Sequence, residues 1–543
     1  MKKLFATILV LSLSVSLLGG CSEKAEENSA SVEGSEKATS TDNQTSNDEV
    51  TVDIGDKSET IALDIWTGNL EYMNDDTFAK NWLEERHNIE ITYKDWPTDE
   101  QIRLMIATDE IPQWWQNVTL TDYQNYVDEE VIREIPMEYI EKYAPKYLEW
   151  IYTFFDDPWQ YYRQDGKIYS MPSPWTLGAY NKVIGIRKDW MENVGVSETP
   201  ETLEELEALY TKFRDNDPDQ NGEKDTYAFT AIGSDDEDKM FFESFGMVFG
   251  AFDVFPNTYQ VKDGTYVRGE ILPEAKEALT VLNRWYENGL IDPEFMVYKK
   301  ENMRKSVVSE RVGSLVDGWY HFLPPEAFYG GYYVENMKGT EAQWEIIAAP
   351  EGPNGDSGLM QTNPLFNAGF VFGKNTTDAE MVRILQVIND SAFNQETFIT
   401  LLKGEEGITY NYDEEDGFVW IPPYDDQVKR REFGIELTAG VTIGGCFNDY
   451  ELQKPINTLP RYLDDRAAAE ALATGKYDQL ASVIKPVWSE NEDHLTQMTL
   501  ENYIKFIIGD RSLDEFDDYV QEWLNAGGQE VLEEADAFYK MYN

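Results

Sequence analysis

The amino-acid sequence predicts an α/β fold, because short strand-like segments alternate with helix-like segments along the chain. Residues 89–93 alternate apolar and polar side chains with a period of two, as a half-buried strand does. Residues 60–66 form an apolar run rich in β-formers, and residues 77–83 favour a helix. A strand, a helix and a strand within roughly 35 residues are typical of a βαβ unit, whose parallel strands need a crossover.

The same alternation continues further along the chain. Residues 202–213 have apolar side chains at helical spacing, and Thr202 with Glu205 forms a capping box at the helix start. Another helix is expected from Pro273 to a stop at Gly289. We also expect buried strands at 312–316 and 346–348, and helices at 380–388 and 513–524.

The first residues of the chain form an export signal. Lys2 and Lys3 precede an apolar stretch at 4–18, which is shorter than the roughly 20 residues that a transmembrane helix needs. Leu18-Gly19-Gly20-Cys21 follows and resembles the site at which bacterial lipoproteins are cleaved and acylated, with palmitate among the attached chains. We therefore expect lipidation at Cys21 and a protein anchored to the cell membrane that faces the outside of the cell. The alternative is an ordinary secretory peptide with a chance cysteine.

A polar stretch separates this signal from the rest of the chain. Residues 22–58 contain hardly any apolar side chains, so they cannot offset their chain entropy by burial, and we expect a disordered acidic tether. The remaining length is too great for a single core, and two or more domains are expected. Cys446 is the only other cysteine, so no internal disulfide is expected after export.

Composition excludes several classes of function. The net charge is −57, which argues against nucleic-acid binding because that needs basic patches. The three histidines leave few candidates for Ser-His or His-metal chemistry, and no common hydrolase or nucleotide-binding motif is present. Paired carboxylates such as 235–236 and 425–426 leave a glycosidase open. The aromatic content of 13% suits a cleft that stacks flat ligand faces on rings.

Several short segments recur in a characteristic order along the chain: VIREIP at 131–136, YAP at 143–145, DGKIYSMP at 165–172, GIRKDW at 185–190, TPET at 199–202 and NGLIDP at 288–293. Together they resemble the extracellular sugar-binding proteins of ABC importers, the family that includes maltose-binding protein. The resemblance extends to the longer lipoproteins near the alginate-oligosaccharide binders. The usual SGDxPD turn of this family reads ATDEIPQ at 107–113, without its glycine and last aspartate.

This resemblance implies a two-lobed periplasmic-binding-protein-like fold of type II, whose lobes are joined by a hinge and close on ligand. We place lobe one at 59–175 plus 340–400, and lobe two at 176–339 plus 401–543. The implied function is non-enzymatic: a monomer binds an oligosaccharide and delivers it to the membrane subunits of an ABC importer. The alternatives are an extracellular carbohydrate-active enzyme and a peptide- or metal-binding importer subunit.

A calcium loop is the sharpest local motif. Oxygen-bearing side chains stand at positions 1, 3, 5 and 9 of a loop beginning at Asp217, with Gly222 at position 6, as in an EF-hand. Position 12 is Ala228, so the final bidentate glutamate is missing. The alternative is a solvated polar turn. The expected ligands of a structural Ca²⁺ are Asp217, Asp219, Asn221, Glu223 through its carbonyl, and Asp225.

The sugar contacts are expected where parallel strands end, because ligands of α/β domains bind at that edge. Rings cover the flat faces of a sugar, while amides and carboxylates bind its hydroxyl groups. The resemblance also places polar contacts after the first strand and a stacking tryptophan at Trp319, which we expect to be half exposed. The predicted ligand residues are Trp66, Thr67, Asn69, Trp115, Gln116, Asn117, Trp175, Trp319 and Tyr320.

Overall fold

The computed structural model describes residues 53–542 except 68–69, 74–75, 175–180, 234–238, 329, 366, 436–446 and 448. Cys21, Asn69, Trp175, Cys446 and the acidic pair at 235–236 therefore lie outside the described residues. Buried apolar side chains form a first core of residues from 63–171, 365–401 and 447, and a second core from 184–360 and 480–535. A smaller third cluster takes residues from 183–346 together with Ala469 and Ala473.

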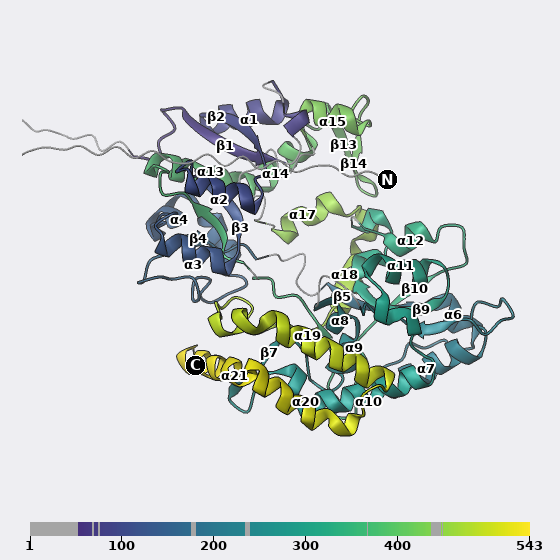
Figure 1. Ribbon diagram of the computed structural model, residues 1–543. Coiled ribbons are helices and arrows are strands. Elements are labelled where there is room, and N and C mark those ends of the chain that lie inside the picture. The colour runs from purple at the N-terminus through teal and green to yellow at the C-terminus, as the bar shows by residue number, and fades with distance from the viewer. Residues whose placement is uncertain are drawn as a thin grey trace, which may run out of the picture. The chain divides into compact units, whose positions relative to one another are not determined.

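The first core begins with the βαβ unit that the sequence predicts. β1 (Ile61–Thr67) and β2 (Ile89–Asp95) pair in parallel from Ile61 opposite Ile89, and α1 (Phe78–His87) connects them. A second sheet has the order β3-β12-β4 with antiparallel pairing. The remaining elements are α2 (Asp99–Ala107), β3 (Trp114–Val118), α3 (Leu120–Asp128), α4 (Met137–Tyr143), α5 (Pro145–Ile151), β4 (Ser170–Met171), β12 (Gly369–Phe372), α13 (Asp378–Ser391) and α14 (Gln395–Lys403) (Figure 1).

A mixed four-stranded sheet separates the second core from the third cluster. Its order is β10-β5-β9-β6, with β5 antiparallel to β9 and β6 parallel to β9. Side chains of β5 enter both apolar groups, because Ile184 and Ile186 belong to the second core and Val183 to the third cluster. The bounds are β5 (Lys182–Arg187), α6 (Lys188–Asn193), α7 (Leu203–Asp215), β6 (Tyr227–Phe229), α11 (Lys300–Val308), β9 (Val312–Gly318), α12 (Tyr332–Asn336) and β10 (Trp344–Ile347).

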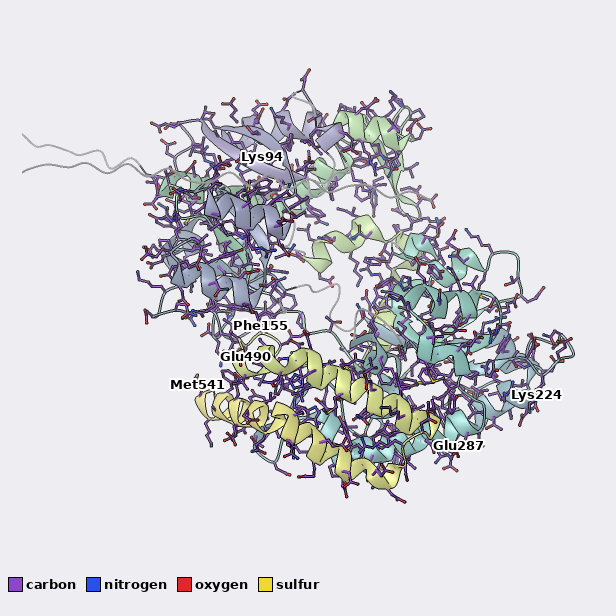
Figure 2. The ribbon with its side chains drawn as sticks, in the orientation of Figure 1. Lys94, Phe155, Lys224, Glu287, Glu490 and Met541 are labelled. Carbon is purple, nitrogen blue, oxygen red and sulfur yellow. The ribbon has the colours of Figure 1, made fainter. Side chains whose placement is uncertain are left out.

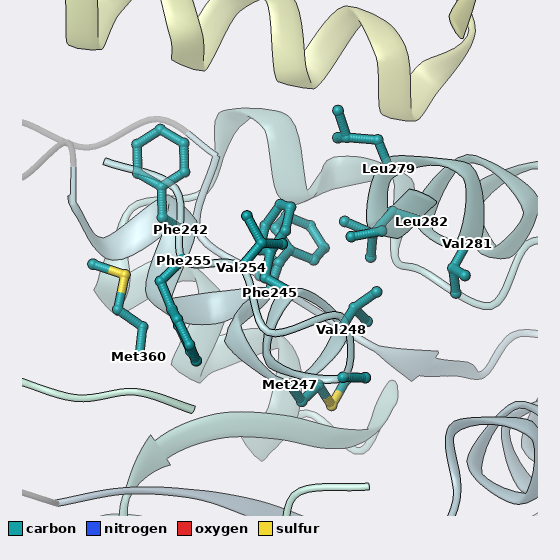
Figure 3. Close-up of a cluster of buried hydrophobic side chains, with 14 of the residues drawn as sticks. Phe242, Phe245, Met247, Val248, Val254, Phe255, Leu279, Val281, Leu282 and Met360 are labelled. Carbon is teal, nitrogen blue, oxygen red and sulfur yellow. The ribbon is translucent and has the colours of Figure 1, made fainter. Parts of the chain in front are cut away.

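Helices supply most of the second core. Figure 3 shows phenylalanine, valine, leucine and methionine side chains of this core, which come from residues 242–255, α10 and Met360. The elements are α8 (Lys239–Ser244), α9 (Gly246–Gly250), β7 (Tyr259–Lys262), β8 (Thr265–Arg268), α10 (Pro273–Glu287), β11 (Leu359–Met360), β15 (Gly475–Lys476), α19 (Pro486–Ile508), α20 (Phe516–Trp523) and α21 (Gln529–Tyr542).

The predicted helices and strands are confirmed where the sequence pattern was strongest. α7 begins after Thr202 with the capping box in place, since Thr202 accepts from the Glu205 N–H and Glu205 reaches back. α10 begins at Pro273, and Gly289 beyond its end has a φ of +68°, which glycine adopts without strain. The expected helix at 513–524 is a 3₁₀ turn followed by α20.

Two segments pack with a different core from the one that the sequence-based lobe boundaries predict. Residues 340–360 were placed in lobe one, but β10 pairs with β5, and Met360 belongs to the second core. Residues 404–435 were placed in lobe two, but Phe433 of α15 (Gln427–Phe433) stacks on Phe78 of α1 at 5.0 Å between ring centres. This segment also holds the hairpin of β13 (Tyr410–Asp413) and β14 (Gly417–Trp420).

The chain returns to the third cluster through α17 (Tyr450–Asn457). The Thr458 hydroxyl donates to the Ala327 carbonyl at 2.8 Å, and the Leu459 N–H donates to the Glu326 carbonyl at 2.9 Å. α18 (Leu463–Leu472) then packs beside β10. α17 therefore connects Phe447, which belongs to the first core, with the third cluster.

Residues 53–58, which the sequence assigns to the tether, are bound to the first core instead. Asp53 accepts hydrogen bonds from the Tyr143 hydroxyl at 2.7 Å and from the Lys142 ammonium at 2.9 Å. A Cβ at Gly55 would lie 2.2 Å from a ring carbon of Tyr143, so this position needs glycine. We call residues 53–58 the docked segment.

Backbone carbonyls of the docked segment are held by α13 and by the end of α1. Gln386 donates to the Gly55 carbonyl at 2.9 Å, and the buried Arg383 guanidinium donates to the Asp56 carbonyl at 3.1 Å. Asn88 donates to the Lys57 carbonyl at 2.8 Å. The disorder prediction failed here because hydrogen bonds, rather than apolar burial, fasten the segment.

Candidate functional site

The predicted calcium loop follows α7 and forms a closed set of hydrogen bonds. The Gly222 N–H donates to Asp217 Oδ2 at 3.0 Å, and the Glu223 N–H donates to Asn221 Oδ1 at 2.6 Å. The Asn221 amide donates to Asp219 Oδ2 at 2.8 Å and to Asp225 Oδ1 at 3.1 Å. Figure 2 labels Lys224 in this loop. Hydrogen bonds thus link the side chains of Asp219, Asn221 and Asp225 to one another, while Asp217 is bound to the loop backbone.

The electrostatics of this loop favour a cation. Asp217 Oδ1 and Asp219 Oδ1 are buried and have no hydrogen-bond partner within the described residues. Burial raises the pKa of Asp219, and the nearby Asp217 and Asp225 carboxylates raise it further. Clustered carboxylates with unused oxygens match the hard oxygen ligands that Ca²⁺ takes. Across the described ranges, no group of three or more His, Cys, Asp or Glu side chains is arranged as a metal site.

Most of the predicted ligand residues at the end of β1 and in β3 are buried in the first core. Trp66 is 3% exposed, and its indole N–H donates to the Trp114 carbonyl at 3.0 Å. Thr67 is also buried. Trp115 is 5% exposed and packs edge-on against Tyr126 at 5.7 Å. Gln116 and Asn117, which follow Trp115 in β3, are half-buried and exposed respectively.

Trp319 lies in the third cluster rather than on a half-exposed surface. It is 3% exposed, the Phe328 ring centre lies 5.3 Å away, and the Arg466 guanidinium lies 5.2 Å from the Trp319 ring centre. The neighbouring Tyr320 is half-buried. Sequence position predicted the strand end correctly, but it could not reveal that α18 brings Arg466 over the ring. Trp319 thus packs in a different apolar group from Trp66 and Trp115.

A buried charge network supports the backbone before Trp319. Asp317 accepts from the Arg304 guanidinium at 3.0 Å and from the Tyr333 hydroxyl at 2.8 Å. Burial opposes the charge of Asp317, but the positive charges of Arg304 and Lys182 and the Tyr333 hydrogen bond outweigh it and lower the pKa of Asp317. Burial lowers the pKa of His321 to about 4, so this imidazole is neutral at physiological pH. The network fixes Gly318 and Trp319 at the end of β9.

A cavity of about 710 Å³ lies beside α5 and contains groups that sequence reasoning missed. The rings of Trp150, Phe154 and Phe393 line it. Trp150 lies 5.6 Å from Phe154 and 5.2 Å from Phe393 between ring centres. The polar lining is Lys146, Glu149, Thr153, Asp449 and Glu451. We call this space the α5 cavity; Figure 2 labels Phe155, the residue after Phe154.

The α5 cavity joins residues from distant parts of the chain. Phe393 follows α13, and Asp449 caps the start of α17 by accepting the Leu452 N–H at 3.2 Å. Burial raises the pKa of Asp449, and the neighbouring Glu451 adds to the effect. No periodicity links these positions in the sequence, so only the fold could reveal them. The aromatic run Tyr152 to Phe155 was the one available signal.

A second, smaller cavity of about 280 Å³ lies where the chain leaves the second core. It is lined by Gln361, Asn363, Lys485 and Trp488, with Thr121 from the start of α3. The Gln361 amide is already engaged, because it donates to the Lys182 and Thr474 carbonyls. These contacts give Gln361 a structural role at the crossing between the two cores.

Comparison with known proteins identifies the architecture. No protein-family model matches the chain. The polygalacturonan/rhamnogalacturonan-binding protein YtcQ of Bacillus subtilis is 24% identical over 379 residues, 69% of this chain and 71% of that protein. The lipoprotein LipO of the same organism is 24% identical over 362 residues, 65% of this chain and 68% of its own length.

Solved structures agree over almost the whole body. The Streptococcus pneumoniae ABC-transporter substrate binding protein FusA in complex with kestose has a TM-score of 0.60 at 18% identity, covering 89% of this chain and 99% of FusA. The fold is that of an ABC-transporter solute-binding protein. A solute-binding protein from Bifidobacterium longum infantis has a TM-score of 0.63 at 14% identity, covering 90% and 99% of the two chains. The predicted two-lobed α/β class and the predicted resemblance are thereby confirmed.

Further features of the solute-binding fold bear on calcium and the membrane. One solved structure with a TM-score of 0.60 and 18% identity is an EF-hand mutant of FusA, so a loop of this type exists in that protein. In the part of the chain that the structure describes, no helix is long and apolar enough to cross a membrane. Of the acidic pair at 425–426, Asp426 caps α15 by accepting the Val428 N–H.

Proposed function

We propose that this protein is the lipid-anchored, oligosaccharide-binding subunit of an ABC importer, acting outside the cell as a monomer without catalysis. One observation carries the proposal: two relatives that match about two thirds of this chain are named as a polygalacturonan/rhamnogalacturonan-binding protein and as a lipoprotein. A structural neighbour, FusA, was solved with the oligosaccharide kestose. The importer's membrane subunits would receive the sugar, and the lipid at Cys21 would hold the protein at the membrane.

The accessible members of the predicted ligand set support contacts of two kinds. Gln116 and Asn117 offer amides for sugar hydroxyl groups, and Tyr320 offers a half-buried ring. Trp66, Thr67, Trp115 and Trp319 are buried, so we assign them the support of these contacts rather than a ligand-covering surface.

An oligosaccharide screen tests the function. A sugar that binds only the folded protein should raise its melting temperature. At a sugar concentration of 100 times the Kd, the free energy of unfolding should rise by about 2.7 kcal/mol. We expect at least one uncharged or acidic oligosaccharide to do so, while dipeptides and tripeptides do not. Incubation should produce no new reducing ends. New reducing ends would support the carbohydrate-active enzyme instead, and stabilisation by peptides alone would support a peptide-binding importer subunit.

Calcium at the loop after α7 is part of the proposal. Asp217, Asp219, Asn221 and Asp225 would hold the ion with the carbonyl of Glu223, and the ion would neutralise their mutual repulsion. Its role would be to fix the loop between α7 and β6, with no contact to sugar.

Removal of calcium is expected to lower the melting temperature of the protein. A chelator should destabilise the wild type by about 2.7 kcal/mol when calcium was present at 100 times its Kd. Asp217→Asn should abolish this difference, and asparagine tolerates the φ of +48° at this position. Asp263→Asn is the control, because Asp263 has a similar φ of +52° in the turn between β7 and β8. Identical melting curves with and without chelator would contradict the calcium assignment.

Replacement of Cys21 is expected to release the protein from the membrane. Cys21→Ser removes the thiol that would carry the lipid, so the variant should move from the membrane fraction to the soluble fraction. Cys446→Ser is the matched control and should stay membrane-bound. If Cys21→Ser remains as firmly bound as the wild type, the anchor lies elsewhere.

A further inference from the structure

We propose that the α5 cavity is a subsite for one unit of the oligosaccharide, and that it accepts an uncharged sugar in preference to a uronate. The inference rests on the proposed function and adds a location and a ligand class to it. Its starting observation is a cavity of about 710 Å³ that combines three aromatic rings with carboxylates.

The lining matches the two faces of a sugar ring. Phe154 is 43% exposed, whereas Trp150 and Phe393 are each 7% exposed. Two buried rings therefore support one accessible ring. Apolar C–H faces of a pyranose or furanose stack on such rings. Carboxylate oxygens accept hydrogen bonds from hydroxyl groups, and a cavity of this size lies within the range of small-molecule sites.

The charges of the lining select between sugar classes. The ionisable side chains of the lining are three carboxylates, Glu149, Asp449 and Glu451, and one cation, Lys146. A uronate would add another carboxylate to this acidic set, and a like charge within about 4–6 Å disfavours ionisation. The whole chain carries a net charge of −57, which opposes anionic ligands at long range as well. An uncharged sugar is not repelled by these charges, and its hydroxyl groups still donate hydrogen bonds to the carboxylates.

The two walls of the cavity belong to different parts of the fold. α5 and Phe393 belong to the first core, whereas α17, which begins beside Asp449, leads to the bond between Thr458 and the Ala327 carbonyl. A sugar held in this cavity therefore contacts the connection between the first core and the third cluster. Occupancy would fix the start of that connection.

Binding measurements on single variants test the subsite. The probes are a neutral fructo-oligosaccharide and an oligogalacturonate of equal length, each titrated by calorimetry. The wild type should bind the neutral probe at least about tenfold more tightly, the equivalent of one pKa unit of charge repulsion. Phe154→Ala should weaken binding of the neutral probe about three- to tenfold, because one stacking ring is lost. The double variant Glu149→Gln with Glu451→Gln should strengthen binding of the oligogalacturonate relative to binding of the neutral probe.

Matched controls separate this inference from the proposed function. Tyr152→Ala removes an equally exposed ring, 50% exposed, that does not line the cavity, and it should leave both affinities unchanged. A thermal melt of each variant verifies folding. Equal affinity of Phe154→Ala and wild type, or a wild type that prefers oligogalacturonate, overturns the subsite while leaving the proposed function intact. A wild type that binds no oligosaccharide in the wider screen overturns both.

Discussion

Trp319→Ala is expected to lower the free energy of unfolding by about 3–5 kcal/mol, as loss of a large buried aromatic ring does. The ring is almost fully buried, and the side chains of Phe328 and Arg466 cover it. Its removal leaves a cavity in the third cluster and takes the cation–π partner from a buried guanidinium. Urea denaturation followed by far-UV circular dichroism measures the change.

The control for this variant is Trp82→Ala in α1. Trp82 is only half-buried, with Arg86 above its ring, so its loss should cost much less stability. A Trp319→Ala variant as stable as the wild type, but with weaker sugar binding, would contradict the packing role. That outcome would restore the stacking role predicted from the sequence.

Arg268→Met is expected to destabilise the protein by about 3–5 kcal/mol, because it leaves a buried carboxylate without its partner. Arg268 and Glu270 are each 1% exposed, and Arg268 Nε donates to Glu270 Oε1 at 2.9 Å. The guanidinium also stacks 3.8 Å from the ring centre of Trp488 in α19. Arg268 therefore joins the end of the strand β8 to the first turn of α19.

A double variant distinguishes the pair from its parts. Arg268→Met with Glu270→Leu removes both charges, and it should be more stable than Arg268→Met alone, since apolar pairs replace buried ion pairs at little cost. Asp536→Asn breaks an exposed ion pair to Lys540 and should change stability little. If the double variant is as unstable as the single one, packing rather than charge pairing accounts for the loss.

Local structure could be predicted from the sequence wherever one segment carries its own signal. The capping box at Thr202 and the proline at Pro273 fixed the starts of α7 and α10, and period-two alternation fixed β2. The hydrogen-bonded loop at 217–225 likewise carries its own signal, because EF-hand ligands stand at fixed spacings within one loop.

Features that depend on distant segments could not be predicted. The cover over Trp319 comes from Arg466, nearly 150 positions later, and the α5 cavity needs Phe393 and Asp449 from separate parts of the chain. The boundary near residue 340 failed for the same reason, since only strand pairing shows that β10 belongs beside β5. Solvent exposure of an aromatic ring is a property of the assembled fold rather than of its own position.

The docked segment determines how mechanical load enters the molecule. A pull on the chain before Asp53 reaches the body through the bonds of Asp53 to Lys142 and Tyr143, and of Gly55 and Asp56 to α13. All of these attachments belong to elements of the first core. Tension applied to the chain before Asp53 would therefore enter the body through one group of elements, the first core.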